Sequence, residues 1–406
     1  MSNPSDQPII PPPEDRARRA QELLRACVHC GFCNATCPTY TLTGDEREGP
    51  RGRLYLMKDL LSGHAGGADL GPLSHCLSCR SCETTCPAGV HYSEILDTVR
   101  ERTQEQRPKG QRILDQLSVV ALSARRPLSA IMGGARRLRP FAPKAFRQRV
   151  LPSTHGLEWP ATRHARRVGL LIGCVQPALR PDLDTKAALV LDHLGISAQQ
   201  VGPGCCGALP YHLHAHDEGR STARATLILA EAGEWEGLTS TASGCTAFLK
   251  DYPRLFQDTE AARRAQAFAA TVTDIAAWID PARLPRVPEQ QRRRIAWHAP
   301  CSLQHALKEA GRVEAILQAL GHALVPVADG ALCCGSAGPY SVRHPRLATA
   351  LGRRKWQTLT GADPEVVVTA NIVCQQHLAR HGDRPVHHWL DLVYEALTNQ
   401  DRAGRD

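Results

Sequence analysis

Two short cysteine runs of identical spacing restrict what this chain can fold into more than any other feature of its sequence. Both runs have the pattern C-x2-C-x2-C-x3-C-P, and they occupy residues 27–38 and 76–87. A cysteine at every third residue of a tight loop directs three thiolates at one polynuclear metal centre. The fourth cysteine lies one residue too far along, and the proline after it fixes the direction in which the chain leaves. Each run therefore predicts a metal-binding loop whose last cysteine turns away.

This spacing is the signature of bacterial two-cluster ferredoxins, in which the fourth cysteine ligates the cluster of the other run. The sequence therefore predicts two [4Fe-4S] clusters with crossed ligand sets. Zinc sites usually combine two C-x2-4-C knuckles, so zinc or structural thiols are the weaker alternative. The expected ligands are, for the first cluster, Cys27, Cys30, Cys33 and Cys86 and, for the second cluster, Cys76, Cys79, Cys82 and Cys37.

The other eight cysteines form two quartets whose corresponding members are 127 to 129 residues apart. So constant an offset indicates a duplicated domain, and it is far longer than the period of a solenoid repeat. Each quartet contains a Cys-Cys-Gly turn, in which the glycine permits a backbone conformation closed to other residues. The quartets consist of Cys174, Cys205, Cys206 and Cys245, and of Cys301, Cys333, Cys334 and Cys374.

These quartets are candidate sites for a further cluster or metal, and inert core thiols are the alternative. Both copies repeat all four positions, which favours metal or redox use. A C-x-x-C ending would add a fifth cysteine, but Phe248 and His377 occupy those two positions. Each quartet is thus one ligand short of the five-cysteine pattern, and His377 is the substitute that the sequence offers.

Strand and helix patterns alternate through both repeats. Apolar strand-like segments at 168–172 and 294–298 precede the first cysteine of each quartet. The alternation predicts largely parallel sheets with the cysteines just beyond the carboxyl ends of the strands. We expect a multi-domain α+β chain, in which a helical two-cluster ferredoxin-like domain is followed by a duplicated pair of α/β Cys-Cys-Gly domains. The expected divisions are 1–104 for the ferredoxin-type domain, 105–167 for a basic helical connector, 168–287 for Cys-Cys-Gly module 1 and 288–406 for module 2.

Composition limits the cellular compartment and the kinds of partner that we expect for this chain. The chain has 406 residues and no apolar stretch of the ~18–20 residues that a membrane span needs. Without a signal-like N-terminus we expect a cytoplasmic protein, in which sixteen cysteines serve metals or redox chemistry. The net charge of +9 comes mainly from arginine. The basic face of the connector is interpreted either as solvated surface or as a docking surface. Nucleic-acid binding would also explain the charge, but aromatic interleaving and a known motif are missing from the sequence.

The same residues resemble a known family, the iron–sulfur subunits of glycolate oxidase, which is also called glycolate dehydrogenase. The likeness rests on CVHCGFCNATCP at 27–38, GDE at 44–46, GPRGR at 49–53, CLSCRSCETTCP at 76–87 and the segment 371–378. It spans nearly the whole chain. Within it, Arg51 and Arg53 are interpreted either as docking residues or as partners in ion pairs.

The resemblance implies an electron-transfer subunit that has no catalytic residues of its own. A separate flavin (FAD) subunit would oxidise glycolate to glyoxylate, and electrons would leave this chain toward a quinone or another membrane acceptor. That places the chain in the cytoplasm, at the inner face of the cell membrane. We expect electrons to enter at one cluster, cross to the other and leave near the repeats. The ferredoxin cysteines carry over as cluster ligands one by one, whereas related heterodisulfide reductase subunits use the fifth cysteine that is missing here.

The same architecture also resembles the iron–sulfur subunit of anaerobic glycerol-3-phosphate dehydrogenase, and another hydroxy-acid dehydrogenase would fit it as well. The glycine- and arginine-rich stretch at 44–53 favours glycolate. A basic nucleic-acid-binding protein with structural clusters is the alternative from a different class.

Overall fold

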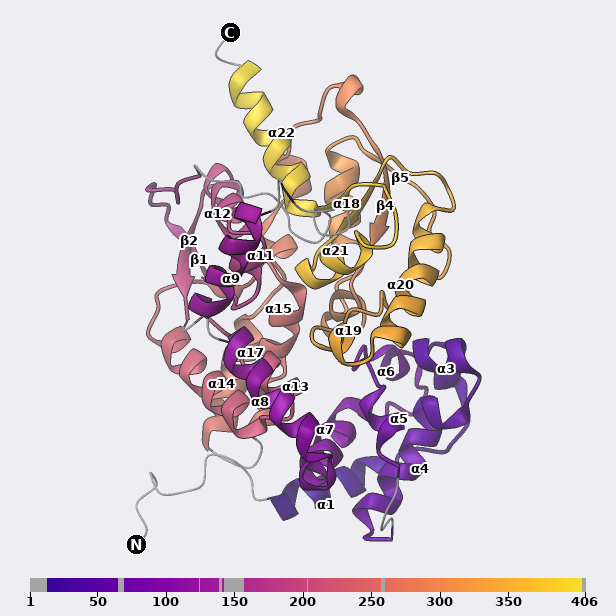
Figure 1. Cartoon of the computed structure of the whole chain (residues 1–406). Helices are drawn as coiled ribbons and strands as arrows, with labels where there is room; N and C mark the ends of the chain where they lie inside the picture. Colours follow the sequence, from indigo (N-terminus) through magenta and orange to yellow (C-terminus); the bar gives the residue numbers. More distant parts are fainter. Residues whose placement is uncertain are drawn as a thin grey trace, which may run out of the picture.

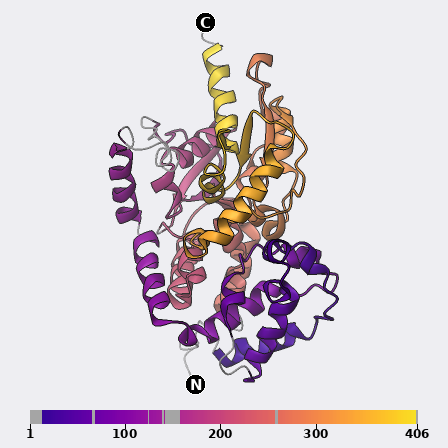
Figure 2. The same ribbon diagram turned by 45° about the vertical axis from the view of Figure 1, so that its right-hand side comes forward.

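The structure, a computed structural model, consists of three packed units and two connector helices (Figure 1). A helical ferredoxin-like unit at the N-terminal end lies against two α/β modules, module 1 and module 2, which follow in the sequence. The connector helices run along one side of module 1 (Figure 2). The residues that the structure describes are 13–64, 69–123, 125–138, 141, 157–202, 204–256 and 260–403.

The ferredoxin-like unit is built of short helices around one apolar core. Its elements are α1 (Pro13–Leu24), α2 (Phe32–Ala35), α3 (Pro38–Thr43), η2 (Glu46–Glu48), α4 (Pro50–Leu61), α5 (Gly71–Ser74), α6 (Ser81–Thr85), α7 (Tyr92–Arg102) and η3 (Gln104–Gln106). Met57 of α4 and Ile95 and Leu96 of α7 are fully excluded from solvent. Pro38, which follows the first run, lies in the first turn of α3, where its fixed φ suits a helix start. The two runs thus lie on loops that this helical core holds in place.

The connector contains α8 (Lys109–Ser123) and α9 (Arg125–Leu138), which lie beside module 1. Val119 of α8 is buried, and Arg136 of α9 donates hydrogen bonds to the carbonyls of Ala178 and Leu179. Residues 142–156 of the expected connector lie outside the described part of the chain. Among the described residues, every helix is too short or too polar to span a lipid bilayer.

Module 1 contains a three-stranded parallel sheet in the order β2-β1-β3. Its strands are β1 (Arg166–Leu171), β2 (Ile196–Val201) and β3 (Gly237–Thr239). Its helices are α11 (Gln176–Leu179), α12 (Leu183–His193), α13 (Ala208–His212), α14 (His216–Glu231), α15 (Ser243–Lys250), α16 (Tyr252–Leu255) and α17 (Glu260–Thr271), followed by η5 (Ile275–Trp278), η6 (Pro281–Arg283) and η7 (Glu289–Gln291). The first cysteine, the Cys-Cys-Gly turn and the last cysteine follow β1, β2 and β3 in turn, as expected.

Module 2 repeats this plan with one more strand, in the order β5-β4-β6-β7, and all of its pairings are parallel. The strands are β4 (Arg294–His298), β5 (Ala323–Leu324), β6 (Val366–Thr369) and β7 (Val386–His388). The other elements are the π-helical turn η8 (Ser302–Leu307), α18 (Arg312–Ala319), α19 (Tyr340–Arg343), α20 (Pro345–Thr360), α21 (Ile372–Leu378) and α22 (Trp389–Ala403). The predicted helical ferredoxin-like domain and duplicated α/β pair are confirmed.

The two modules share one hydrophobic core. Trp389 and Val393 of α22 are buried in the same apolar cluster as Leu183 and Leu191 of α12, which belongs to module 1. A helix at the end of the chain therefore covers the first module as well as its own. The expected division at residues 287 and 288 stays a prediction, because the apolar core is continuous across it.

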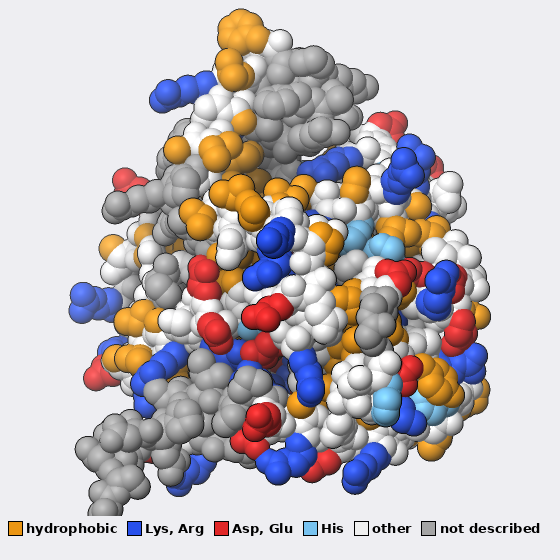
Figure 3. All heavy atoms as spheres, turned by 60° about the horizontal axis from the view of Figure 1, so that its bottom comes forward, with side chains coloured by type: hydrophobic (Ala, Val, Ile, Leu, Met, Phe, Trp, Pro, Cys, Tyr) orange, Lys and Arg blue, Asp and Glu red, His pale blue; other side chains and the backbone are white. Residues whose placement is uncertain are grey.

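The basic charge is not gathered into a single patch on the face shown in Figure 3, where Lys and Arg side chains alternate with Asp and Glu. Arginines near the start of module 1 also have acidic partners. Arg166 pairs with Glu236 and Arg167 with Glu234, each at 3.0 Å. This distribution gives the nucleic-acid alternative no support on that face.

Candidate iron–sulfur and metal sites

The backbone of both cysteine runs has the same unusual conformation. The residues directly before and after the second cysteine of each run are left-handed, with φ of 54° at His29, 83° at Gly31, 52° at Ser78 and 64° at Arg80. A left-handed conformation costs a residue with a side chain about 1–2 kcal/mol, so strain repeated at equivalent positions marks a functional loop. Left-handed residues of this kind form the concavities of backbone N–H groups found at many iron–sulfur sites.

The cysteines of the two runs surround two separate small cavities. The first site is lined by Cys27, Cys30, Cys33, Cys82 and Cys86. The second site is lined by Cys37, Cys76, Cys79 and Cys82. Each site thus includes the fourth cysteine of the other run, in agreement with the crossed pattern. The assignment of each thiolate to one cluster stays a prediction, because Cys82 borders both cavities.

The thiols at these sites are suited to a metal cluster and not to free thiolates. Burial, followed by the neighbouring Cys27, raises the pKa of Cys33 to about 11, and burial raises the pKa of Cys79 and Cys82 as well. Bound metal displaces such protons and stabilises the thiolates. Among the described residues, three ligand atoms lie within 4.8 Å of one another only in module 2. The preference for iron–sulfur clusters over zinc at these cysteines rests on the C-x2-C-x2-C-x3-C-P spacing of both runs.

Two buried side chains donate hydrogen bonds to sulfurs of the second site. Arg53 is only 1% exposed, and its Nη1 lies 3.7 Å from Cys37 Sγ, while Nη2 lies 2.9 Å from Glu48. The hydroxyl of Tyr92 lies 3.8 Å from Cys76 Sγ. Such donors withdraw charge from cluster ligands and raise the reduction potential. Arg53 is thus an internal partner of a cysteine and of Glu48, and not a docking residue.

The stretch at 44–53 has a structural explanation as well. Arg51 forms an ion pair with Glu46 at 2.7 Å. A Cβ on Gly52 would lie 2.2 Å from the carbonyl oxygen of Glu46, so only glycine allows α4 to approach η2 this closely. This close approach fixes the start of α4, the helix that carries Arg53. Arg53 directly follows this glycine, but the sequence alone did not distinguish a buried arginine from a docking residue.

The three units meet at one cavity of about 410 Å³. Nine cysteines line it, and they come from the second run and from both quartets: Cys76, Cys79, Cys174, Cys206, Cys245, Cys301, Cys333, Cys334 and Cys374. Leu77 and Cys79 pack in one cluster with Cys301 and Cys333. The second ferredoxin site therefore borders the quartet of module 2 directly, which the spacing of the cysteines alone did not reveal.

The structure brings the module 1 quartet together in the order Cys174, Cys205, Cys206 and Cys245, each sulfur hydrogen-bonded to the next. The thiols of Cys174 and Cys206 donate to Cys205, and these hydrogen bonds lower the pKa of Cys205. Gly207 has φ of 89°, and a Cβ there would lie 2.5 Å from the carbonyl oxygen of Gly219. The glycine of the turn is thus required by conformation, as predicted, and also by packing.

The module 2 quartet has the same arrangement. Hydrogen bonds join Cys301, Cys333, Cys334 and Cys374 in that order. Gly335, the counterpart of Gly207, has φ of 86°, and a Cβ there would lie 2.7 Å from Leu351. Both quartets therefore form compact groups of four hydrogen-bonded sulfurs.

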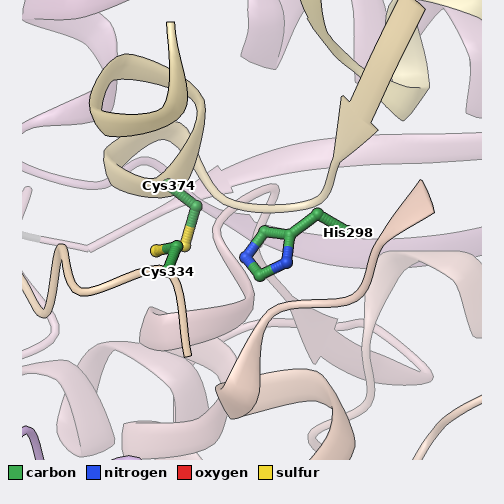
Figure 4. A group of neighbouring side chains, drawn as sticks. All are labelled: His298, Cys334 and Cys374. Carbon is green, nitrogen blue, oxygen red and sulfur yellow. The ribbon is translucent and has the colours of Figure 1, made fainter. Parts of the chain in front are cut away.

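The substitute ligand expected from the sequence, His377, lies outside the group of ligand atoms that the described part of the structure brings together. His377 Nε2 lies 3.1 Å from the carbonyl oxygen of Ala348, so this ring contacts α20. Instead, the ring of His298 at the end of β4 faces Cys334 and Cys374, as Figure 4 shows. One ligand atom from each of these three buried residues lies within 4.8 Å of the others. One feature of the sequence could have indicated His298. It is a histidine at the end of a predicted buried strand, at the position where module 1 has Leu171.

Comparisons with known proteins agree with this architecture. Residues 23–90 match the family described as the 4Fe-4S dicluster domain, and residues 168–250 and 295–379 match the family described as the cysteine-rich domain. The glycolate oxidase iron–sulfur subunit of Escherichia coli (strain K12) is 42% identical over 395 residues, which cover 95% of this chain and 97% of that protein. The probable glycolate oxidase iron–sulfur subunit of Bacillus subtilis (strain 168) is 25% identical and covers 94% and 96% of the two chains.

A more distant relative has a different substrate in its name. It is one of the polypeptides of the dihydromethanophenazine:CoB–CoM heterodisulfide reductase of Methanosarcina barkeri (strain Fusaro), and it is 23% identical over 92% of this chain and 94% of its own. The matched segments include the two ferredoxin sites and both quartets, so the chain is an electron-transfer protein with iron–sulfur clusters of the 4Fe-4S type. From the extent of the first match, the chain belongs to the family of glycolate oxidase iron–sulfur subunits.

Proposed function

We propose that this chain is the electron-transfer subunit of a flavin-dependent glycolate oxidase. A partner subunit oxidises glycolate to glyoxylate, and this chain passes the electrons toward a quinone or another membrane acceptor. The observation that carries the proposal is the order of the cysteine sites. The first site is open to the surface, the second borders module 2, and the quartets lie around the central cavity.

In this proposal the flavoprotein partner binds over the first site. Cys30 is exposed there, and Val28 and Phe32 are 72% and 64% exposed although both are hydrophobic. Tyr55, which is half exposed, stacks on His29 with the ring centroids 4.1 Å apart. An apolar group of this kind around a redox site is typical of a surface that a partner covers.

The residues around the second site keep it inside the molecule. Arg53 and Tyr92 donate to its sulfurs, and the apolar contact of Leu77 and Cys79 with module 2 excludes solvent. When bound, the clusters supply one-electron redox chemistry, which polypeptide side chains do not provide. The contribution of the chain is to hold the ligands, to tune them by hydrogen bonds and to set the distance between sites.

The second surface of the proposal is an apolar stripe on α8, which consists of Ile113, Leu114, Leu117 and Val120, all more than half exposed. Their spacing places them on one side of the helix. Together with the basic residues Lys109 and Arg112, the stripe has the composition of a helix that lies on an anionic lipid surface. We assign it to the cytoplasmic face of the cell membrane, where the acceptor is located.

The first experiment is co-expression with the flavoprotein partner and anaerobic addition of glycolate. We expect the two proteins to co-purify and the cluster absorbance to bleach on addition of glycolate. Phe32→Asp should weaken both effects at least tenfold, whereas Ile228→Asp, which alters an exposed apolar residue of module 1, should leave them unchanged. Purification with a flavoprotein that oxidises glycerol 3-phosphate and not glycolate would contradict the proposal.

The second experiment tests the stripe by flotation of the full chain with vesicles that contain phosphatidylglycerol. We expect binding that decreases with salt and is lost in the double variant Leu117→Asp, Val120→Asp. Ile228→Asp is again the matched control. Equal flotation of the double variant would exclude the stripe as the membrane contact, and loss of flavoprotein binding in that variant would assign the stripe to the partner instead.

A further inference from the structure

The two quartets are not chemically equivalent, because one of them has a histidine beside its sulfurs. We propose that His298 is an iron ligand in module 2, where it binds the same metal ion as Cys334 and Cys374 in a centre held by the Cys-Cys-Gly quartet. The choice of iron rests on the proposed function, because a redox-active metal continues the series of sites. Module 1, in this inference, has no nitrogen ligand.

The first support is the environment of the His298 side chain. It is 1% exposed, and neither ring nitrogen has a hydrogen-bond partner among the residues that the structure describes. A buried polar atom without a partner costs about 1–3 kcal/mol, so proteins keep such atoms rarely and usually for a function. A metal ion bound to the ring provides the partner that the polypeptide does not.

The second support is geometric. His298 comes from the end of β4, Cys334 from the Cys-Cys-Gly turn and Cys374 from α21, yet the three ligand atoms lie within 4.8 Å of one another. Figure 4 shows the imidazole ring turned toward the two sulfurs. Cys301 and Cys333 continue the row of sulfurs, so that five donor atoms are available in this module.

The third support is the comparison of the two modules. Leu171 occupies the place of His298 in module 1, at the same distance before the first cysteine. Lys355 on α20 also has no charged counterpart, because Thr226 occupies its position on α14. Lys355 is fully buried, and its ammonium donates to the carbonyls of Asp329 and Gly330 at 3.0 Å each.

The charge of Lys355 acts on the quartet, since Cys334 and Cys333 are among the groups that it interacts with electrostatically. A buried cation beside several thiolates compensates for the negative charge that a thiolate-bound metal centre concentrates. Module 2 thus contains both an extra ligand and an extra positive charge, and module 1 has apolar or neutral residues at both positions.

Iron fits these donors and this place in the molecule. Sulfur and imidazole ligands suit both zinc and iron. However, Cys79 of the second ferredoxin site packs in one cluster with Cys301 of this quartet, and zinc there would end the series of redox sites. Where histidine replaces cysteine on a cluster iron, the reduction potential rises, which would favour this centre as the final site for electrons.

The experiment uses the full chain, purified without oxygen from cells grown with either natural or 15N-labelled histidine. We expect pulsed EPR of the reduced protein to detect one histidine nitrogen coupled to a cluster, with a coupling that changes on labelling. His298→Ala should abolish this coupling. His377→Ala, a buried histidine of the same module, is the matched control and should retain it.

His298→Cys guards against a folding defect, because it preserves a ligand at this position. We expect it to keep the iron content of the wild type while it loses the nitrogen coupling. Three results would overturn the inference: no nitrogen coupling in the wild type, coupling that persists in His298→Ala, or zinc in place of iron at this quartet. If one of these results occurs while the ferredoxin-type EPR signals are intact in every sample, only the inference about His298 fails. If the ferredoxin-type signals are absent, the proposed function itself is contradicted.

Discussion

Two arginines near the cysteines, Arg53 and Arg80, form contacts that hold the structure around the cysteine runs in place. Arg53 is buried against Cys37, and it also donates to Thr39 and to the carbonyl of Pro72. Arg80 adopts a left-handed conformation and forms an ion pair with Asp251 of module 1 at 2.9 Å. Arg53 thus contacts a predicted cluster ligand, whereas Arg80 joins the ferredoxin-like unit to module 1, and both account for part of the positive charge without forming a basic surface.

The crossed ligand sets predict opposite effects for the last cysteine of each run. Cys86→Ser should disturb the first cluster, although Cys86 belongs to the second run, and Cys37→Ser should disturb the second cluster. Cys79→Ser should abolish electron transfer, and Cys245→Ser should leave both ferredoxin-type EPR signals intact. The measurement is EPR of each variant at stepped potentials. If Cys86→Ser affects the same signal as Cys79→Ser, the crossed assignment is wrong.

Tyr92→Phe tests the tuning of the second site without the loss of a ligand. Removal of one donor to Cys76 Sγ should lower the potential of the second cluster and leave that of the first unchanged, because negative charge on the sulfur is then less stabilised. We expect a loss of only about 1 kcal/mol in the free energy of unfolding. Redox titration followed by EPR measures the shift, and equal potentials in wild type and variant would show that this hydrogen bond has no tuning role.

At the scale of elements, the strands and helices next to the cysteines were predictable because each has a clear local pattern. The apolar segments at 168–172 and 294–298 correspond to β1 and β4, and the spacing of the quartets correctly indicated equivalent strands. Strand β7 was not anticipated, because its three residues pair with β6 only through tertiary contacts. The role of helix α22 was not predictable either, because no local sequence pattern indicates that it packs on α12.

The helical turn η5 provides a pH-dependent test at this scale. Asp274 caps η5 by accepting a hydrogen bond from the Ala276 N–H at 3.0 Å, and burial raises its pKa to about 7. Because this folded-state pKa lies above the unfolded value, the protonated form stabilises the fold at low pH. That stability is fully present below about pH 4 and is lost as the pH rises toward 7.

Asp274→Asn keeps the cap and removes the charge, so the variant should lack this pH dependence. Between about pH 6 and pH 8 the wild type should lose about 1.4 kcal/mol more than the variant. Urea unfolding of both proteins across this range measures the difference. Parallel stability curves would show that Asp274 is ionised in the folded protein throughout.

At the scale of the whole molecule, the modules are joined by a buried ion network as well as by their shared core. Arg180, Asp182 and Lys186 of module 1 surround Asp391 of α22, and Arg180 and Lys186 each lie 2.7 Å from an oxygen of Asp391. These partners outweigh the effect of burial and hold the pKa of Asp391 at about 2. The sequence predicted the duplication correctly, but charges more than 200 residues apart gave no sign that they would meet.

Asp391→Asn should therefore destabilise the whole chain and not one module alone. Removing one partner from a buried ion network costs about 3–5 kcal/mol, because Arg180 and Lys186 remain buried with less compensation. The measurement is unfolding of the holoprotein in urea near neutral pH, with the exposed Asp383→Asn as control. A loss below about 1 kcal/mol would mean that the network contributes no more than a surface ion pair.

The central cavity is the feature that sequence reasoning could not reach. The cysteine spacing predicted four groups of ligands, and the structure places members of three of them, the second run and both quartets, around this one cavity. Cys79 and Cys301 belong to one packed cluster because of the way in which the units dock. Ion pairs such as Arg80 with Asp251 and Arg343 with Asp115 form between them. Docking of preformed units is specified by side chains scattered along the chain, so no local pattern reports it.

The most direct test of this account is the iron and acid-labile sulfide content of the full chain isolated under strictly anaerobic conditions. We predict a brown protein with at least about eight irons and eight sulfides per chain from the two ferredoxin sites, and a further contribution from module 2 that disappears in Cys334→Ser. A colourless protein that contains zinc or no metal would contradict it.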